Sequence, residues 1–110
     1  MNASLIVEEV KEKLRRRFGS PRQQRRAQVF TFGDALTCSI SYSKLLNGHK
    51  YFYAVPAQMA EPSHQFDATA LGDFVLLVCG SAERVLVLPR SLVSSMLNDV
   101  PTRRVDVFVD

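Results

Sequence analysis

Half of the basic side chains of this chain lie in one stretch, KLRRRFGSPRQQRRAQ, which covers residues 13–28 and contains no acidic residue. Six of its seven cations are arginines, and the planar guanidinium group of arginine can contact two phosphate oxygens at once. Glutamines lie among these arginines and can hydrogen-bond phosphate groups or base edges. The stretch predicts a nucleic-acid-binding surface made of Lys13, Arg15, Arg16, Arg17, Arg22, Gln23, Gln24, Arg25 and Arg26.

The charge of the chain is unevenly distributed, which leaves other partners open for the basic stretch. Residues 1–26 carry a net charge of +5, whereas residues 27–110 carry −2. The arginines could therefore pair with acids of the same domain, with another protein, or with an acidic membrane surface. Nucleic acid, and duplex DNA in particular, is the partner that we favour. Stacking on single strands is disfavoured, because the one aromatic residue among the arginines, Phe18, belongs to the apolar stripe of a helix.

A second candidate contact surface is the aromatic segment YFY at residues 51–53. Side chains alternate between the two faces of a strand, so Tyr51 and Tyr53 share one face and Phe52 takes the other. Two arrangements remain open. The tyrosines either pack in the core or under a helix, which we favour, or they form an exposed platform for a base or a peptide.

The other chemically active side chains form no recognisable catalytic or metal-binding pattern. The serines of SISYSK (residues 39–44) alternate along a strand and do not reproduce a Ser-x-x-Lys arrangement at a helix start. His49 and His64 lie in loops without a nucleophile motif, and together with Cys38 and Cys79 they show no zinc spacing. Both cysteines lie in apolar stretches and are predicted to be buried free thiols. We therefore expect no catalytic residue, no metal and no cofactor.

Periodicity predicts one α+β domain, with a basic helix and loop over residues 4–26 and a sheet with a second helix over residues 27–110. Apolar residues at steps of three to four predict an amphipathic helix over residues 4–18, which Ser4 would cap. Acidic residues lie toward the first half of this segment and basic residues toward its end, an order that suits the helix dipole. Ser91 should cap the second, short helix.

Alternating or continuous apolar runs predict the strands, and turn residues separate them. The strands should form a curved, mainly antiparallel sheet of five or six strands. The two Val- and Leu-rich runs should form a hairpin of central strands that are covered on both faces. The predicted strands are residues 27–32, 36–42, 50–55, 73–80, 84–89 and 105–110.

Two further functions remain open from the same elements. The strand at residues 105–110 should lie at an edge, so it or the first helix could pair with a protein partner or with a second copy. The connection at residues 56–72 is long for a compact domain and contains His64, so a small hydrolase that uses this loop is a third alternative.

The stretches KYFYAVP and GDFVLLVCGSAERVLVLPRSLVSSML resemble the C-terminal half of restriction-endonuclease-like domains and the small accessory domains found beside such nucleases. The resemblance extends from Lys50 to Leu97 and is one of hydrophobic pattern. It implies a DNA-handling role, such as target recognition. The acid-x-Lys motif that holds the metal in such nucleases is absent, because neither Lys44 nor Lys50 has an acid two residues before it. The resemblance therefore implies a non-catalytic module.

The length of 110 residues, with 46% hydrophobic and 23% charged residues, predicts a single globular domain. No apolar run is long enough for a transmembrane helix. The first residues, MNASLIVEEVKEK, carry acids where a signal peptide has positive charge, so we expect a cytoplasmic protein without a membrane partner.

Overall fold

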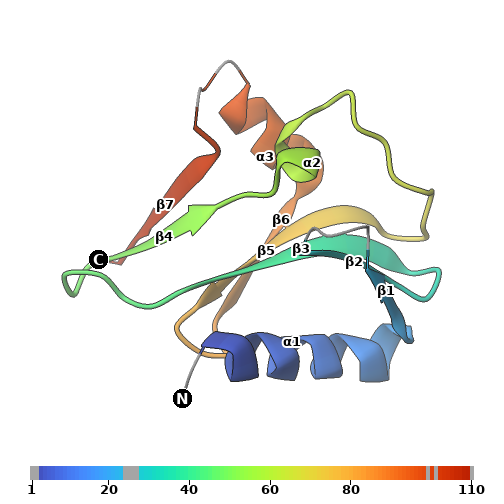
Figure 1. Cartoon of the computed structure of the whole chain (residues 1–110), viewed down its shortest axis with the longest axis horizontal. Helices are drawn as coiled ribbons and strands as arrows, with labels where there is room; N and C mark the ends of the chain where they lie inside the picture. The colour runs from blue at the N-terminus through green and yellow to red at the C-terminus, as the bar shows by residue number, and fades with distance from the viewer. Residues whose placement is uncertain (1–2, 24–27, 99, 101, 110) are drawn as a thin grey trace.

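The computed structural model describes residues 3–23, 28–98, 100 and 102–109 of the chain. These residues form an α+β domain with seven strands and three helices (Figure 1), as the sequence predicts for the fold class. In chain order the elements are α1 (Ala3–Phe18), β1 (Pro21–Gln23), β2 (Val29–Phe32), β3 (Leu36–Ser43), β4 (Lys50–Ala54), α2 (Ala57–Ala60), β5 (Gly72–Cys79), β6 (Val85–Pro89), α3 (Arg90–Leu97) and β7 (Arg104–Phe108).

The described strands form two sheets. The main sheet has the spatial order β1-β2-β3-β5-β6, and β4 pairs with β7 in a second sheet of two strands. Neighbours in the main sheet are antiparallel except β3 and β5, which run parallel from Leu36↔Gly72 to Ser43↔Cys79. Parallel neighbours need a long crossover connection, and here that connection contains β4 and α2. The expectation of a mainly antiparallel single sheet is therefore correct only in part.

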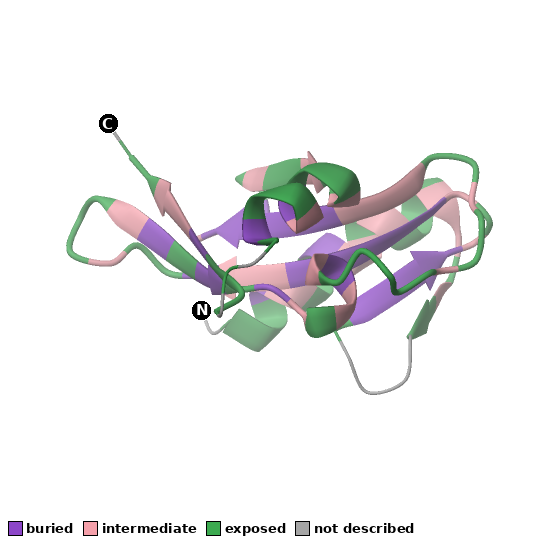
Figure 2. Ribbon diagram, turned by 90° about the horizontal axis from the view of Figure 1, so that it is seen from above, coloured by how far each residue is buried: buried purple, intermediate pink, exposed green. Residues whose placement is uncertain are grey.

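Both faces of the main sheet are covered, which creates two hydrophobic cores. On one face α1 packs Ile6 and Val10 against Phe30 and other residues of β2, β3 and β5. On the other face Val93 of α3 and Met59 of α2 pack together with strands β4 and β7. Figure 2 shows buried residues along the strands in the middle of the molecule. The five-stranded sheet is thus the middle layer, and it fixes the positions of α1 and α3 on opposite sides.

Strand β2 is more deeply buried than its alternating sequence predicts. All four of its residues are buried, although Thr31 is polar. The hydroxyl of Thr31 lies 2.8 Å from the hydroxyl of Thr37 on β3, so this polar pair is satisfied inside the protein. The alternation indicated a half-buried strand, and that prediction is wrong because the threonines pair across the two strands under a second layer.

The predicted hairpin of β5 and β6 is confirmed, with Val78 opposite Val85 and Phe74 opposite Pro89. The strands differ in burial, however. Five consecutive residues of β5 are buried, whereas β6 lies at the edge of the sheet with Leu86 and Val87 exposed. The prediction that both are central strands is wrong for β6, because the chain turns into α3 and adds no further strand beyond it.

The helix starts and the connection after α1 also differ from the predictions. Ser4 lies inside α1, which already includes Ala3, and α3 begins at Arg90 without a side-chain cap, so Ser91 is not its cap. Pro21–Gln23, expected as loop, form β1 by pairing with β2. Cys38 and Cys79 are free and buried, as predicted. Among the described residues no helix is long and apolar enough to cross a membrane.

Candidate nucleic-acid interface

The end of α1 and strand β1 meet at one corner of the molecule (Figure 1). The chain turns there at Gly19, whose φ of 110° lies in the left-handed region that glycine tolerates. The amide of Gly33 donates to the carbonyl of Ser20 at 3.2 Å, and a side chain at position 33 would collide with the carbonyl of Phe18. These contacts hold the end of α1 against the β2–β3 turn. We call the described cations of this region the basic corner: Lys13, Arg15, Arg16, Arg17 and Arg22.

One carboxylate, Glu12, serves two arginines of the basic corner. Arg15 donates to it from Nε at 2.8 Å and from Nη2 at 2.6 Å, and Arg16 donates from Nε at 3.3 Å. The Arg15 hydrogen bonds and the charges of both arginines lower the pKa of Glu12 to about 2. Glu12 also raises the pKa of Arg15. Sharing one negative charge between two guanidinium groups leaves a surplus of positive charge on the exposed surface.

The other cations of the basic corner are paired more weakly. Lys13 lies 3.9 Å from the exposed carboxylate of Glu83. The guanidinium carbon of Arg17 lies 5.5 Å from the centre of the Phe18 ring. Arg22 is exposed and makes no ion pair with any residue that the structure describes. An exposed pair such as Lys13–Glu83 is worth about 0–1 kcal/mol, so a polyanion could displace it at little cost.

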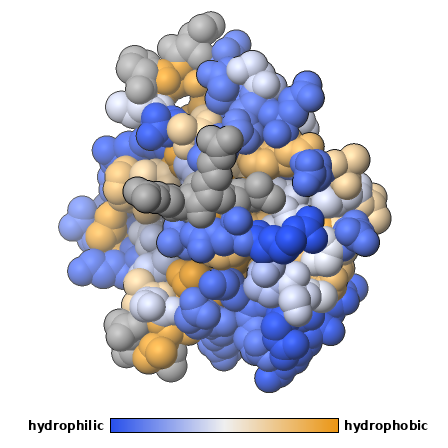
Figure 3. All heavy atoms as spheres, turned by 45° about the vertical axis from the view of Figure 1, so that its right-hand side comes forward, coloured by the Kyte–Doolittle hydropathy of each residue, from blue (hydrophilic) through white to orange (hydrophobic). Residues whose placement is uncertain are grey.

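The structure therefore brings together part of the predicted interface. In Figure 3, where the right-hand side of Figure 1 comes forward, hydrophilic side chains cover much of the lower part of the view. Arg16 has 72% of its side chain exposed, and Gln23 on β1 is exposed beside Arg22. The predicted residues Gln24, Arg25 and Arg26 lie outside the described residues. The prediction that Arg22 lies in a loop is wrong, because it lies on β1.

The alternative of an exposed tyrosine platform is excluded by burial. Tyr51 is 6% exposed and Tyr53 is 1% exposed, and both pack in the core together with Val93 of α3. The hydroxyl of Tyr53 donates to the carbonyl of Val78 at 2.9 Å, and burial raises its pKa. Phe52 takes the outer face of β4 instead, where the guanidinium of Arg104 stacks 4.5 Å from its ring centre. The tyrosines are thus part of the fold and not of a binding surface.

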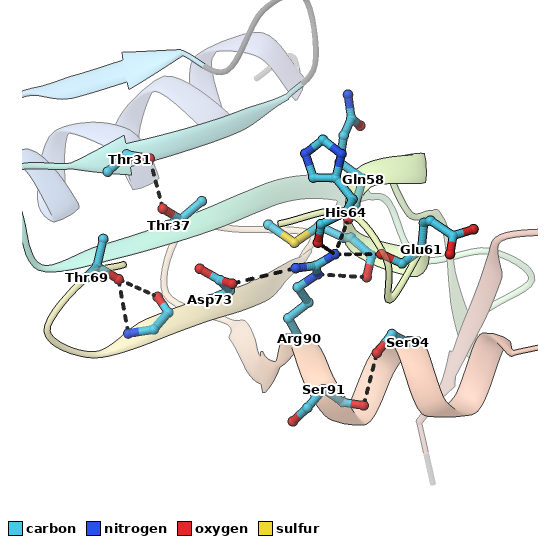
Figure 4. A network of polar contacts seen from close by, with 12 residues as sticks. Thr31, Thr37, Gln58, Glu61, His64, Thr69, Asp73, Arg90, Ser91 and Ser94 are labelled. Atoms are coloured by element: carbon cyan, nitrogen blue, oxygen red, sulfur yellow. Dashed lines mark hydrogen bonds and ion pairs between the residues drawn. The ribbon is translucent and has the colours of Figure 1, made fainter. Parts of the chain in front are cut away.

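A partly buried arginine that sequence reasoning missed contacts the connection between β4 and β5 (Figure 4). Arg90 donates from Nη2 to the carbonyls of Gln58 at 2.7 Å, Glu61 at 2.6 Å and His64 at 2.6 Å. Its Nη1 lies 3.7 Å from a carboxylate oxygen of Asp73, and its side chain is 12% exposed. Arg90 follows Pro89 at the start of α3, and no feature of the local sequence distinguishes it from a solvated arginine. Its contacts join the start of α3 to the long connection.

The histidines do not complete a catalytic group in the described part of the chain. The His64 ring packs edge-on against Phe66 with ring centres 4.8 Å apart, and its ring nitrogens make no hydrogen bond with described residues. The Nδ1 of His49 lies 2.9 Å from the carbonyl of Asn47, and its ring stacks on Phe108. No group of three His, Cys, Asp or Glu side chains among the described residues could hold a metal ion.

Comparison of the chain with protein-family models, with curated proteins and with solved structures found no match. The resemblance of Lys50–Leu97 to restriction-endonuclease-like domains therefore stays a prediction. The basic corner gathers five described cations near the junction of α1 and β1.

Proposed function

We propose that this domain binds the phosphate backbone of nucleic acid, preferentially duplex DNA, through the basic corner. The observation that carries the proposal is the surplus of exposed guanidinium groups at the junction of α1 and β1. Arg15 and Arg16 share the single carboxylate of Glu12, and Arg22 has no acidic partner among the described residues. Arginine suits this role because its flat, two-pronged donor geometry matches phosphate oxygens.

The predicted contacts are to phosphate groups and not to bases. Base recognition in duplex DNA needs a helix or ribbon that enters the major groove. Here α1 lies along the sheet and its inner face is in the core, so its C-terminal end and β1 offer charge at a surface. We therefore expect affinity that is nearly independent of sequence and falls steeply with salt. The role would be that of a non-catalytic accessory or target-recognition module in a DNA-processing system.

The test is a set of binding isotherms with labelled duplexes of two unrelated sequences and with a single strand, each at 50 and 200 mM salt. The test variant carries Arg16→Gln, Arg17→Gln and Arg22→Gln, which remove charge but keep long polar side chains. We expect similar losses of affinity for both duplexes and a salt slope smaller by roughly 2 to 3, because each lost phosphate contact contributes about 0.9.

The matched control carries Lys44→Gln and Lys50→Gln, two cations that lie away from the basic corner around the turn before β4. This control should bind duplex nearly as tightly as the parent. A second variant with Arg22→Ala, Arg25→Ala and Arg26→Ala extends the test to the predicted residues beyond β1. Unchanged duplex binding by both arginine variants would refute the proposal.

A further inference from the structure

The two edges of the main sheet differ, and β6 is the edge without protection. Edge strands are commonly blunted by charged side chains, prolines in mid-strand or bulges, since their free backbone groups can pair with another chain. Strand β6 has the sequence VLVLP, contains no charged residue and pairs with β5 without interruption from Val85 to Pro89. Val87 is 58% exposed and Leu86 is 40% exposed. This strand therefore offers an apolar, unguarded edge.

The hydrogen-bond pattern identifies which backbone groups of β6 are free. The amide of Cys79 donates to the carbonyl of Arg84 at 2.7 Å, so the carbonyl of Arg84 points toward β5. Backbone groups alternate along an antiparallel strand, so those of Leu86 also point toward β5, while those of Val85 and Val87 point away. Pro89 falls in the outward register, where its missing amide costs no hydrogen bond. The free edge thus presents two amides and two carbonyls, from Val85 and Val87.

We propose that β6 pairs antiparallel with β6 of a second copy and forms a symmetric dimer with a continuous ten-stranded sheet. In the pairing that places Val85 opposite Val87 of the other copy, both free amides and both free carbonyls of each strand are used. The two-fold axis then runs perpendicular to the sheet between the two copies of Leu86. Self-complementarity of this kind is what a two-fold interface requires.

The charges that flank β6 are compatible with this register. Arg84 lies opposite Leu88 of the second copy, and Glu83 lies opposite Pro89, so no like charges face each other directly. Arg90 is drawn away from the edge by its contacts with the connection before β5. A pairing centred on Val87 would instead place Arg84 opposite Arg90 and would leave the carbonyl of Val85 without a donor.

Helix α3 adds apolar surface beside the same edge. Its core side carries Val93 and Leu97, and Arg90 marks the flank that faces α2. Helical geometry places Leu92 and Met96 on the opposite flank, and they are 48% and 53% exposed. Figure 2 shows that exposed residues line the outer side of α3. Because Leu86 faces the same side of the sheet as α3, pairing of two β6 strands would bring the α3 flanks together and cover this surface.

The first test is light scattering after size-exclusion chromatography over a hundredfold range of protein concentration, without nucleic acid. We expect the mass to rise with concentration from 12.4 kDa toward twice that value. Val87→Lys places a charge on the edge at an exposed position and should abolish the rise. Leu71→Lys, at an equally exposed position outside the sheet, is the matched control and should leave it unchanged. A parent that is monomeric at every concentration would overturn the proposal.

The second test identifies the register. Leu86→Cys should form an intermolecular disulfide under mild oxidation, because the two copies of residue 86 face each other across the axis. Val87→Cys should cross-link far less, since it faces Val85. The native thiols are buried, and burial raises the pKa of Cys38 to about 12, so they should not compete. Equal cross-linking of both variants, or of neither, would contradict this interface even if the protein self-associates.

Discussion

The outer strands β1 and β6 lie at opposite edges of the main sheet and differ in length, charge and exposure. Strand β1 is three residues long, begins with Pro21 and exposes Arg22 and Gln23, whereas β6 is longer and exposes Leu86. Charge and proline at the first edge discourage strand pairing, and the same charge attracts polyanions. Strand β6 carries no charged residue, and its only proline, Pro89, is its last residue. Under the two proposals above, opposite edges of one sheet contact nucleic acid and a second copy of the chain.

The largest expected effect is on the free energy of unfolding, and it distinguishes Arg90, which follows β6, from the arginines near β1. Arg90→Met should lower the free energy of unfolding by about 1–3 kcal/mol, since it leaves the carbonyls of the connection and the partly buried carboxylate of Asp73 without their donor. Arg16→Met, on the exposed face of α1, should change it by about 0.5 kcal/mol or less. Urea unfolding monitored by circular dichroism measures both. Equal stability of the two variants would mean that the Arg90 contacts do not hold the fold.

Salt should affect the two proposed contacts differently: it should weaken duplex binding strongly and dimer formation only slightly. If about four phosphate groups are contacted, raising the salt concentration from 50 to 200 mM weakens duplex binding roughly 100-fold. Pairing of β6 buries no charge in the strand, so the dimer dissociation constant should change less than about threefold over this range. Fluorescence anisotropy and sedimentation equilibrium give the two constants. A dimer that dissociates as steeply as the DNA complex would indicate a charged interface elsewhere.

Removing the charge of Arg22 should leave both edges of the main sheet without a charged side chain. Arg22→Val leaves a short apolar edge, and a sheet with two unguarded edges can propagate beyond a dimer. We expect species heavier than a dimer at high protein concentration, together with weaker duplex binding. Arg22→Gln, which keeps the position polar, is the control and should stay dimeric. If Arg22→Val forms nothing larger than the parent does, then β1 is too short to pair whatever its side chains.

The smallest expected effect comes from Glu12, the acid that offsets part of the charge beside β1. Its pKa is lowered from the ordinary value of 4.5 to about 2, so the contribution of its ion pairs to stability is present above pH 4.5 and is lost as the pH falls from 4.5 to about 2. Carboxyl chemical shifts in an NMR titration should place the midpoint there. Glu12→Gln releases Arg15 and Arg16 and should tighten duplex binding severalfold, and a titration midpoint near 4.5 would show that the pairs do not form in solution.

Local patterns in the sequence predict the elements well where one physical signal dominates. The apolar stripe and charge order of residues 4–18 indicate α1, and the Val- and Leu-rich runs indicate the β5–β6 hairpin; both are confirmed. The parallel pairing of β3 with β5 is set by how the crossover packs, which no local pattern records. The burial of β2 likewise depends on Thr31 meeting Thr37 across strands.

Some candidate sites can be predicted from the sequence and others cannot. The basic corner can, because its charges are clustered along the chain. The exposure of β6 depends on the chain adding no strand beyond it, and the role of Arg90 depends on carbonyls some 30 residues earlier in the chain, at Gln58, Glu61 and His64. The local sequences of the two segments do not predict that they come into contact.

The most direct test of the division between the two edges is an amide NMR titration of the labelled protein with a short duplex. We expect chemical-shift changes at the end of α1 and along β1, from residue 13 to residue 23, and little change in β6 and α3. Dilution of the free protein should shift the complementary set, residues 84–97. Duplex-induced changes centred on β6 and α3, or none at the basic corner, would contradict the proposal that nucleic acid binds beside β1.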